Sequence, residues 1–100
     1  MKATEIYNSA IEKYYAGNSS SDKKYALKEF EIAAKMGLDL AMLRAGEMHF
    51  FGDGVEPSKE VGIYWITKAC EVAEHYNDLF IQDHRTGTFL DAKEFLSEFG

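Results

Sequence analysis

The side chains in this sequence that could support catalysis or metal binding are three histidines and one cysteine. His49, His75 and His84 do not pair four residues apart, and no cysteine motif joins them, so their spacing does not predict a zinc site. No serine stands in a nucleophile elbow. Cys70 has no second cysteine to pair with, and we interpret it as a small buried helical residue. We therefore predict no catalytic residue, no metal site and no cofactor.

A glycine-rich stretch, "GDGV" at residues 52–55, invites two interpretations as a binding loop. A phosphate cradle would need a preceding strand and a third glycine or a lysine, which this stretch lacks. A calcium loop would need alternating oxygen ligands, which Asp53 and Glu56 alone do not supply. Glycine tolerates the positive φ that a tight turn often requires. The stretch therefore predicts a turn between two helices.

Apolar residues recur at helical spacing along most of the chain, and no segment shows the sustained period-two alternation of a strand. We therefore predict an all-α fold. Oxygens of the serines at 19–21 and of Asp22 can cap the second helix, Asp39 can cap the third, and Pro57 suits the first turn of the fourth. The expected helices span residues 3–16, 22–37, 40–51 and 57–73, followed by a short helix at 76–84, a turn at 85–88 and a last helix at 89–99.

The composition is that of a folded globular domain. Hydrophobic residues make up 46% and charged residues 28% of the chain, a balance that is neither disordered nor membrane-like. No apolar run approaches the roughly 18 residues of a spanning helix. Acids interrupt the apolar pattern at the start of the chain, which therefore lacks the continuous apolar core of a secretory signal. We predict one cytoplasmic domain over residues 1–100.

The net charge of −6 is unevenly distributed along the chain. Residues 1–50 carry 7 basic and 7 acidic side chains, whereas residues 51–100 carry 4 basic and 10 acidic ones. Phosphate groups attract the opposite charge, so we predict no nucleic acid and no membrane among the partners. An acidic surface commonly serves solubility alone, and a basic protein or peptide is the partner it would favour.

Two helix pairs in the sequence repeat one another. The second and fourth expected helices align at an offset of 36 residues, with Ala26 matching Gly62 and Phe30 matching Ile66. The first and third align at an offset of 35 residues, with Ala10 of the first helix matching the alanine at position 45. Small residues recur where helices must approach closely, and large ones recur where they fill the space between. Such periodicity is typical of helical repeat proteins.

The stretch 41–70 resembles the Sel1-like repeat, a relative of the tetratricopeptide repeat. The matching positions are Ala41, Gly46, Gly52, Gly54, Val55, Trp65, Lys68 and Ala69, and the departures are Ala45, His49, Ser58, Val61, Gly62 and Cys70. His49 replaces a packing tyrosine, so we expect a core or half-buried imidazole there. The resemblance implies a short α-solenoid of antiparallel helix pairs, with repeat 1 over residues 3–37, repeat 2 over 38–73 and a degenerate repeat or cap over 74–100.

In a solenoid of this kind, the first helix of each pair lines the concave side. The resemblance therefore implies a groove that mixes aromatic, aliphatic and acidic side chains. The expected residues are Glu5, Asn8, Glu12 and Tyr15 in the first unit, Leu40, Leu43, Glu47, Phe50 and Phe51 in the second, and Tyr76, Leu79 and Asp83 in the third. A peptide or protein loop with Lys or Arg flanked by apolar anchors fits such a groove. The alternative is that Phe50 and Phe51 form a core with the C-terminal helix.

Members of the Sel1-like family act as adaptors in signalling and in the assembly of larger complexes. The resemblance therefore implies a protein–protein interaction module that is not an enzyme. The alternative is a small stoichiometric inhibitor, such as an immunity or antitoxin protein that blocks a toxin or enzyme, and small size and acidity favour it. A homodimer is a third interpretation, because a solenoid usually needs about three repeats to bury a continuous core.

Overall fold

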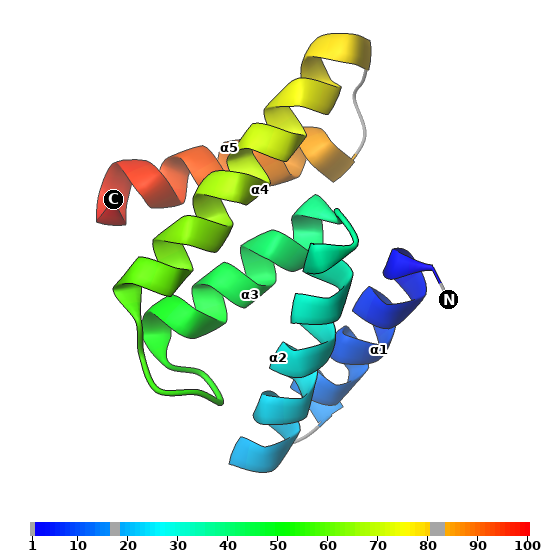
Figure 1. The fold of residues 1–100 in the computed structure, drawn as a ribbon, viewed down its shortest axis with the longest axis vertical. Helices are drawn as coiled ribbons and strands as arrows, with labels where there is room; N and C mark the ends of the chain where they lie inside the picture. The colour runs from blue at the N-terminus through cyan, green and yellow to red at the C-terminus, as the bar shows by residue number, and fades with distance from the viewer. Residues whose placement is uncertain (1, 17–18, 81–83) are drawn as a thin grey trace.

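The structure is a computed structural model that describes residues 2–16, 19–80 and 84–100, with side chains described for 2–16, 19, 21–75 and 87–100. Its helices are α1 (Ala3–Ala16), α2 (Ser20–Lys35), α3 (Asp39–Phe51), α4 (Lys59–Phe80) and α5 (His84–Phe99), and no strand occurs among the described residues. Each helix packs against the next, and α5 also reaches α3. Figure 1 shows α1 beside α2, α3 beside α4, and α5 crossing behind α4. The prediction of an all-α fold is confirmed.

The last two helices differ from the sequence-based expectation. Helix α4 begins at Lys59, two residues after Pro57, and continues to Phe80, so the boundary expected between residues 73 and 74 falls inside a continuous helix. The turn expected at residues 85–88 is wrong, because these residues belong to α5. A helical glycine such as Gly87 costs roughly 1 kcal/mol. Burial of the α5 face that includes Thr88, which is 1% exposed, outweighs that cost.

The starts of α2 and α3 are capped in different ways. Helix α2 has the predicted kind of cap, because Ser19 Oγ accepts a hydrogen bond from the backbone N–H of Asp22 at 3.2 Å. In α3 the N-cap position is Leu38, and Asp39 is the first helical residue rather than the expected cap. A carboxylate in the first turn still interacts favourably with the positive end of the helix dipole.

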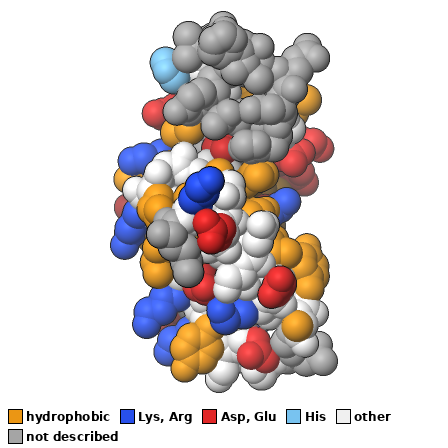
Figure 2. All heavy atoms as spheres, turned by 90° about the vertical axis from the view of Figure 1, so that its right-hand side faces the viewer, with side chains coloured by type: hydrophobic (Ala, Val, Ile, Leu, Met, Phe, Trp, Pro, Cys, Tyr) orange, Lys and Arg blue, Asp and Glu red, His pale blue; other side chains and the backbone are white. Residues whose placement is uncertain are grey.

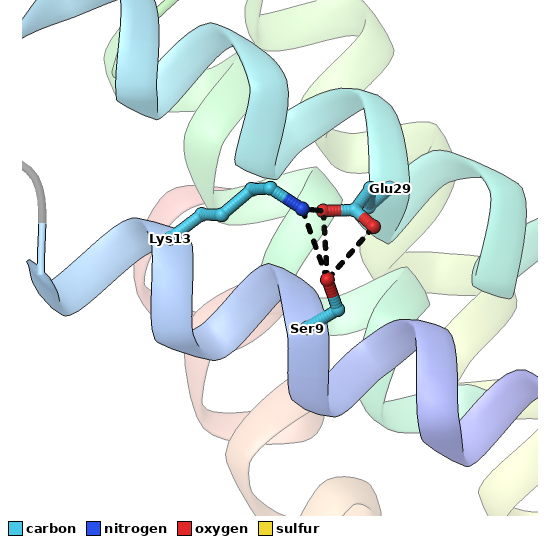
Figure 3. A network of polar contacts seen from close by, with 3 residues as sticks. All are labelled: Ser9, Lys13 and Glu29. Atoms are coloured by element: carbon cyan, nitrogen blue, oxygen red, sulfur yellow. Dashed lines mark hydrogen bonds and ion pairs between the residues drawn. The ribbon is translucent and has the colours of Figure 1, made fainter.

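Helices α1 and α2 are joined by a polar network on their outer side (Figure 3). Ser9 Oγ lies 3.0 and 3.2 Å from the two carboxylate oxygens of Glu29 and 3.0 Å from Nζ of Lys13. Lys13 also forms an ion pair with Glu29. Exposed pairs of this kind contribute about 1 kcal/mol or less. Apolar packing, such as the contact of the Tyr7 and Phe30 rings with centroids 5.5 Å apart, is therefore the main contribution to the pairing.

Helices α3 and α4 cross where two glycines face each other. A Cβ atom placed on Gly46 would lie 2.5 Å from Cγ1 of Ile66 and 2.9 Å from the carbonyl oxygen of Gly62. A Cβ atom on Gly62 would lie 2.6 Å from Cβ of Phe50 and 2.9 Å from the carbonyl oxygen of Gly46. Real Cβ contacts are not this short, so the two backbones approach as closely as they do only because both positions lack a side chain.

The "GDGV" stretch forms the turn between α3 and α4, as predicted. Gly52 and Gly54 have φ values of 76° and 78°, in the left-handed region that favours glycine. The backbone N–H of Ser58 donates to the carbonyl oxygen of His49 at 2.7 Å and closes the turn. A Cβ atom on Gly54 would lie 2.7 Å from the carbonyl carbon of Lys23, so the turn lies directly against the first residues of α2.

The two helix pairs bury equivalent positions. Ala10 of α1 and Ala45 of α3 are both fully buried. Phe30 of α2 and Ile66 of α4 are 1% and 0% exposed. These are the pairs that the sequence offsets of 35 and 36 residues match, so the packing is consistent with a repeat-like arrangement of helix pairs.

Four phenylalanines join the end of α3 to the end of α5. Ring centroids of Phe50, Phe51, Phe95 and Phe99 lie 4.7–5.9 Å apart in every pairing. Phe50 is 9% exposed, because α5 covers that side of α3, whereas Phe51 is 58% exposed. Phe50 is therefore a core residue, as the alternative of a core shared with the C-terminal helix predicted, and its expected place in the groove is corrected.

Candidate binding groove between α1 and α3

A groove runs between α1 and α3, and Phe30 from α2 also contributes to its lining. Its lining residues are Ile11, Tyr14 and Tyr15 of α1, Phe30 of α2, Arg44, Glu47, Met48 and Phe51 of α3, and Asp53 of the following turn. The groove has a volume of about 250 Å³. Positions 11, 14 and 15, and positions 44, 47, 48 and 51, each share one helical face because they are three or four residues apart. One face of each helix thus forms one wall.

At one end of the groove, Arg44 and Glu47 form an ion pair within α3. Nη1 of Arg44 lies 2.9 Å from Oε1 of Glu47. Burial lowers the pKa of the Arg44 guanidinium, but its hydrogen bond to Tyr7 and the attraction of Glu47 outweigh burial, so the pKa is raised. The positive charge of Arg44 is therefore balanced by a carboxylate of the same helix.

At the other end, three side chains from different elements meet. The hydroxyl of Tyr14 donates a hydrogen bond to Oδ2 of Asp53. Nζ of Lys23 donates to the backbone carbonyl of Tyr14 at 2.9 Å and lies 3.4 Å from the centroid of the Tyr14 ring. Because these residues belong to α1, the α3–α4 turn and α2, their contacts join the first helix pair to the second.

The Tyr14–Asp53 hydrogen bond leads to a prediction for alkaline pH. This bond and burial raise the pKa of Tyr14 from 10.0 to about 12. Folding thus favours the neutral phenol, and the associated stability is complete below pH 10 and is lost as the pH rises from about 10 to about 12. In an absorbance titration of tyrosinate, the difference between wild type and Tyr14→Phe should have its midpoint near pH 12. When both proteins also carry Asp53→Asn, the midpoint of this difference should shift toward pH 10. A midpoint of about pH 10 without the Asp53 substitution would contradict the hydrogen bond.

Exposed aromatic rings stand on both walls of the groove. Tyr15 on α1 is 75% exposed and Phe51 on α3 is 58% exposed. Each ring is held by an edge contact, with Tyr15 5.1 Å from Tyr14 and Phe51 5.0 Å from Phe50 between centroids. Exposed apolar side chains beside a concave surface often mark an interaction site, and aromatic side chains dominate binding hot spots.

The structure brings together some of the residues predicted for the groove. Tyr15, Glu47 and Phe51 line it. Two other large apolar residues predicted on α3 do not line the groove, because Leu43 is 2% exposed and Phe50 is in the core described above. Leu40 is half-buried against the core, and Glu5, Asn8 and Glu12 are exposed but lie outside the lining. The side chains of Tyr76 and Leu79, and the whole of Asp83, lie outside the residues that the structure describes.

The difference between the predicted and observed walls is a rotation of the helix faces. The predicted face of α1 ran through positions 5, 8, 12 and 15, whereas the observed one contains 11, 14 and 15. One residue corresponds to about 100° around a helix. The lining residues that the prediction missed are Ile11, Tyr14, Phe30, Arg44, Met48 and Asp53. The spacing of Tyr7, Ile11 and Tyr14 was the available signal, because it marks a continuous aromatic and aliphatic stripe on α1.

The histidine and cysteine side chains that could support catalysis or metal binding have surroundings that indicate packing roles. His49 has a side chain that is 13% exposed, with Nε2 3.2 Å from Oε2 of Glu31, which confirms the half-buried imidazole. Burial, followed by the charge of Glu74, raises the pKa of the Cys70 thiol, so the unreactive protonated form is favoured. In the described part of the chain, no three His, Cys, Asp or Glu side chains gather as a metal site would require.

The side of the molecule that carries α1 presents charges of both signs (Figure 2). Basic side chains are most frequent along one edge of this view, and others lie among the acidic and apolar side chains over the rest of it. This pattern differs from the broad basic stripe that is typical of nucleic-acid binding. Among the described helices, none combines the length and the hydropathy that a membrane-spanning segment needs.

Comparisons of the chain with protein-family models, with curated protein sequences and with solved structures each find no match. The resemblance to the Sel1-like repeat therefore stays a prediction. The structure supports a coarser description, in which five described helices pack in adjacent pairs without strands.

Proposed function

We propose that this chain is a cytoplasmic protein–protein interaction module, an adaptor that receives a peptide or protein loop in the groove between α1 and α3. It performs no catalysis and holds no cofactor. The groove is formed by the first helices of two repeat-like pairs, which are the helices that line the concave side in tetratricopeptide-related solenoids. Its partner is a protein with apolar anchors beside a basic side chain.

The observation that carries this proposal is the pair of exposed rings, Tyr15 and Phe51, on opposite walls of a groove of about 250 Å³. Burying an exposed aromatic ring on binding removes a large apolar area from water, at about 25 cal/mol per Å². Each ring already makes an edge contact with a neighbouring aromatic, which reduces the rotamer freedom that binding would remove. A partner side chain inserted between them would therefore gain affinity at a small cost in entropy.

Selection from a random-peptide display library on the immobilised wild-type protein tests the proposal. We expect the selected peptides to bind the Phe51→Ala and Tyr15→Ala variants at least about tenfold more weakly than wild type. Leu90→Ala and Tyr25→Ala are matched controls, because these residues are 60% and 58% exposed and lie outside the groove lining. Peptides that bind all four variants as tightly as wild type would rule out the groove as the binding site.

The effect of binding on the partner's activity distinguishes an adaptor from an inhibitor. If the chain is a small stoichiometric inhibitor, one enzyme or toxin from the native host should bind tightly and lose its activity at an equimolar ratio. If the chain is an adaptor, its partner should keep its activity when bound, and binding should still depend on Phe51. The acidic surplus of residues 51–100 favours a basic surface on the partner in both cases.

A further inference from the structure

The groove contains more aromatic rings and carboxylates than an apolar anchor alone requires. Four of its lining residues are aromatic, namely Tyr14, Tyr15, Phe30 and Phe51, and two are acidic, namely Glu47 and Asp53. The face of an aromatic ring attracts cations, and the attraction is stronger where water is excluded. A site that combines ring faces with carboxylates is suited to a cation that also has an apolar stem.

The charges within the groove leave one carboxylate without a counter-ion. Arg44 is paired with Glu47 at 2.9 Å, so these two charges balance. Asp53 accepts its hydrogen bond from the neutral phenol of Tyr14. Among the residues that the structure describes, no lysine, arginine or histidine nitrogen lies within ion-pair distance of Asp53. The charged lining residues, Arg44, Glu47 and Asp53, therefore carry a net charge of −1, and Nζ of Lys23 stands at the Tyr14 ring at the same end without being part of the lining. A partner's cation would complement the lining.

A contact within the protein shows how a cation fits beside these rings. Nζ of Lys23 lies 3.4 Å from the centroid of the Tyr14 ring while it donates to the Tyr14 carbonyl. That lysine occupies a face of Tyr14, whereas Tyr15 and Phe51 are still largely exposed. The rings still available to a ligand are thus the two that stand on opposite walls.

Resting on the function proposed above, we infer that the groove is a receptor for the side chain of an arginine in the partner protein. The guanidinium group stacks between Tyr15 and Phe51 and donates hydrogen bonds to Asp53, and its aliphatic stem lies along Ile11 and Met48. Arginine suits this site better than lysine, because its planar group stacks on rings, is weakly hydrated and offers five donors in a fixed fork. The volume of about 250 Å³ lies below the range of typical small-molecule sites and is large enough to admit one arginine side chain.

A titration with single amino-acid derivatives tests this inference without knowledge of the natural partner. The probes are N-acetyl-arginine amide, N-acetyl-citrulline amide, which has the same shape without the charge, and N-acetyl-lysine amide. Two-dimensional amide NMR spectra of the full chain report where each probe binds and how tightly. We expect arginine amide to shift signals of Tyr15, Phe51 and Asp53 and to bind about tenfold more tightly than citrulline amide.

The variant Asp53→Asn keeps an acceptor for Tyr14 but removes the charge, so the preference for arginine over citrulline should fall to about twofold or less. Asp91→Asn, which removes an exposed carboxylate on α5, is the matched control and should leave the preference unchanged. Equal binding of arginine and citrulline amides, a preference for lysine, or no saturable shift with any probe would each overturn the inference.

The outcomes distinguish this inference from the proposed function. If selected peptides depend on Phe51 but are not enriched in arginine, the groove binds proteins and the arginine receptor is wrong. If no peptide depends on Phe51, the proposed function itself fails. If the NMR signals of the groove shift with protein concentration alone, a second copy of the chain occupies the groove, and the inference is overturned. The net charge of −6 on each copy opposes that outcome.

Discussion

The Gly62→Ala variant should be less stable than wild type by about 2–3 kcal/mol, although alanine normally stabilises a helix relative to glycine. The added Cβ would lie 2.6 Å from Cβ of Phe50 and 2.9 Å from both Cα of Phe50 and the carbonyl oxygen of Gly46. Two of these atoms belong to the backbone, which cannot rotate away as a flexible side chain can. The helices must therefore separate, and the packing around Phe50 loosens with them. The midpoint of urea unfolding, followed by circular dichroism, measures the loss.

Gly87→Ala is the matched control for this prediction. Gly87 also lies in a helix, α5, but a Cβ atom placed on it would meet nothing within 4 Å. The same substitution should therefore raise stability by about 0.5–1 kcal/mol. Opposite signs at the two positions are the expected result. A Gly62→Ala variant that is as stable as wild type would show that α3 and α4 do not cross at these glycines.

Two adjacent phenylalanines should respond very differently to truncation. Phe50→Ala is expected to cost about 3–5 kcal/mol, because the ring is 9% exposed and its loss leaves a cavity between α3 and α5. Phe51→Ala should cost about 1 kcal/mol, since the ring is 58% exposed and loses mainly edge contacts with its aromatic neighbours. Urea unfolding of both variants gives the two values, and the amide NMR spectrum of Phe51→Ala should remain that of a folded protein.

This pair of variants separates core from groove at the end of α3. Comparable losses of stability for both would mean that Phe51 is also a core residue, and the proposed binding site would then lose one of its walls. A small loss for both would mean that α5 does not cover Phe50. Only a large loss at position 50 combined with a small one at position 51 agrees with the packing of the four phenylalanines.

The fold could be predicted from the sequence to the extent that it depends on local patterns. The first helix has the predicted bounds, 3–16, because apolar residues recur at helical spacing along it. The turn at 52–55 was predictable because two glycines with positive φ have a clear signature. The start of helix α5 was harder to predict, because Gly87 suggests a turn that would interrupt a helix. Only the buried face of α5, which depends on residues distant in sequence, makes it helical.

The candidate site was less predictable, because a groove depends on how two helices are rotated about their own axes. Periodicity defines a stripe, but the same stripe can face a neighbouring helix or a groove. The resemblance to tetratricopeptide repeats placed Leu43 toward the groove, whereas the structure buries it in the core. One end of the groove is defined by Arg44 with Glu47 and the other by Tyr14 with Asp53. Tyr14 and Asp53 are 39 residues apart in the sequence. Helical periodicity carries no information about such a contact.

The turn at residues 52–55 connects two helices, and it also holds the first helix pair against the second. Gly54 lies against the first residues of α2, and Asp53 reaches Tyr14 on α1. A single protease cut in this turn would leave the described helices covalently intact while freeing Asp53 from the end of the groove. The turn is thus the point at which limited proteolysis would open the proposed groove without cutting a helix, and a partner bound over Asp53 would protect the chain from that cut.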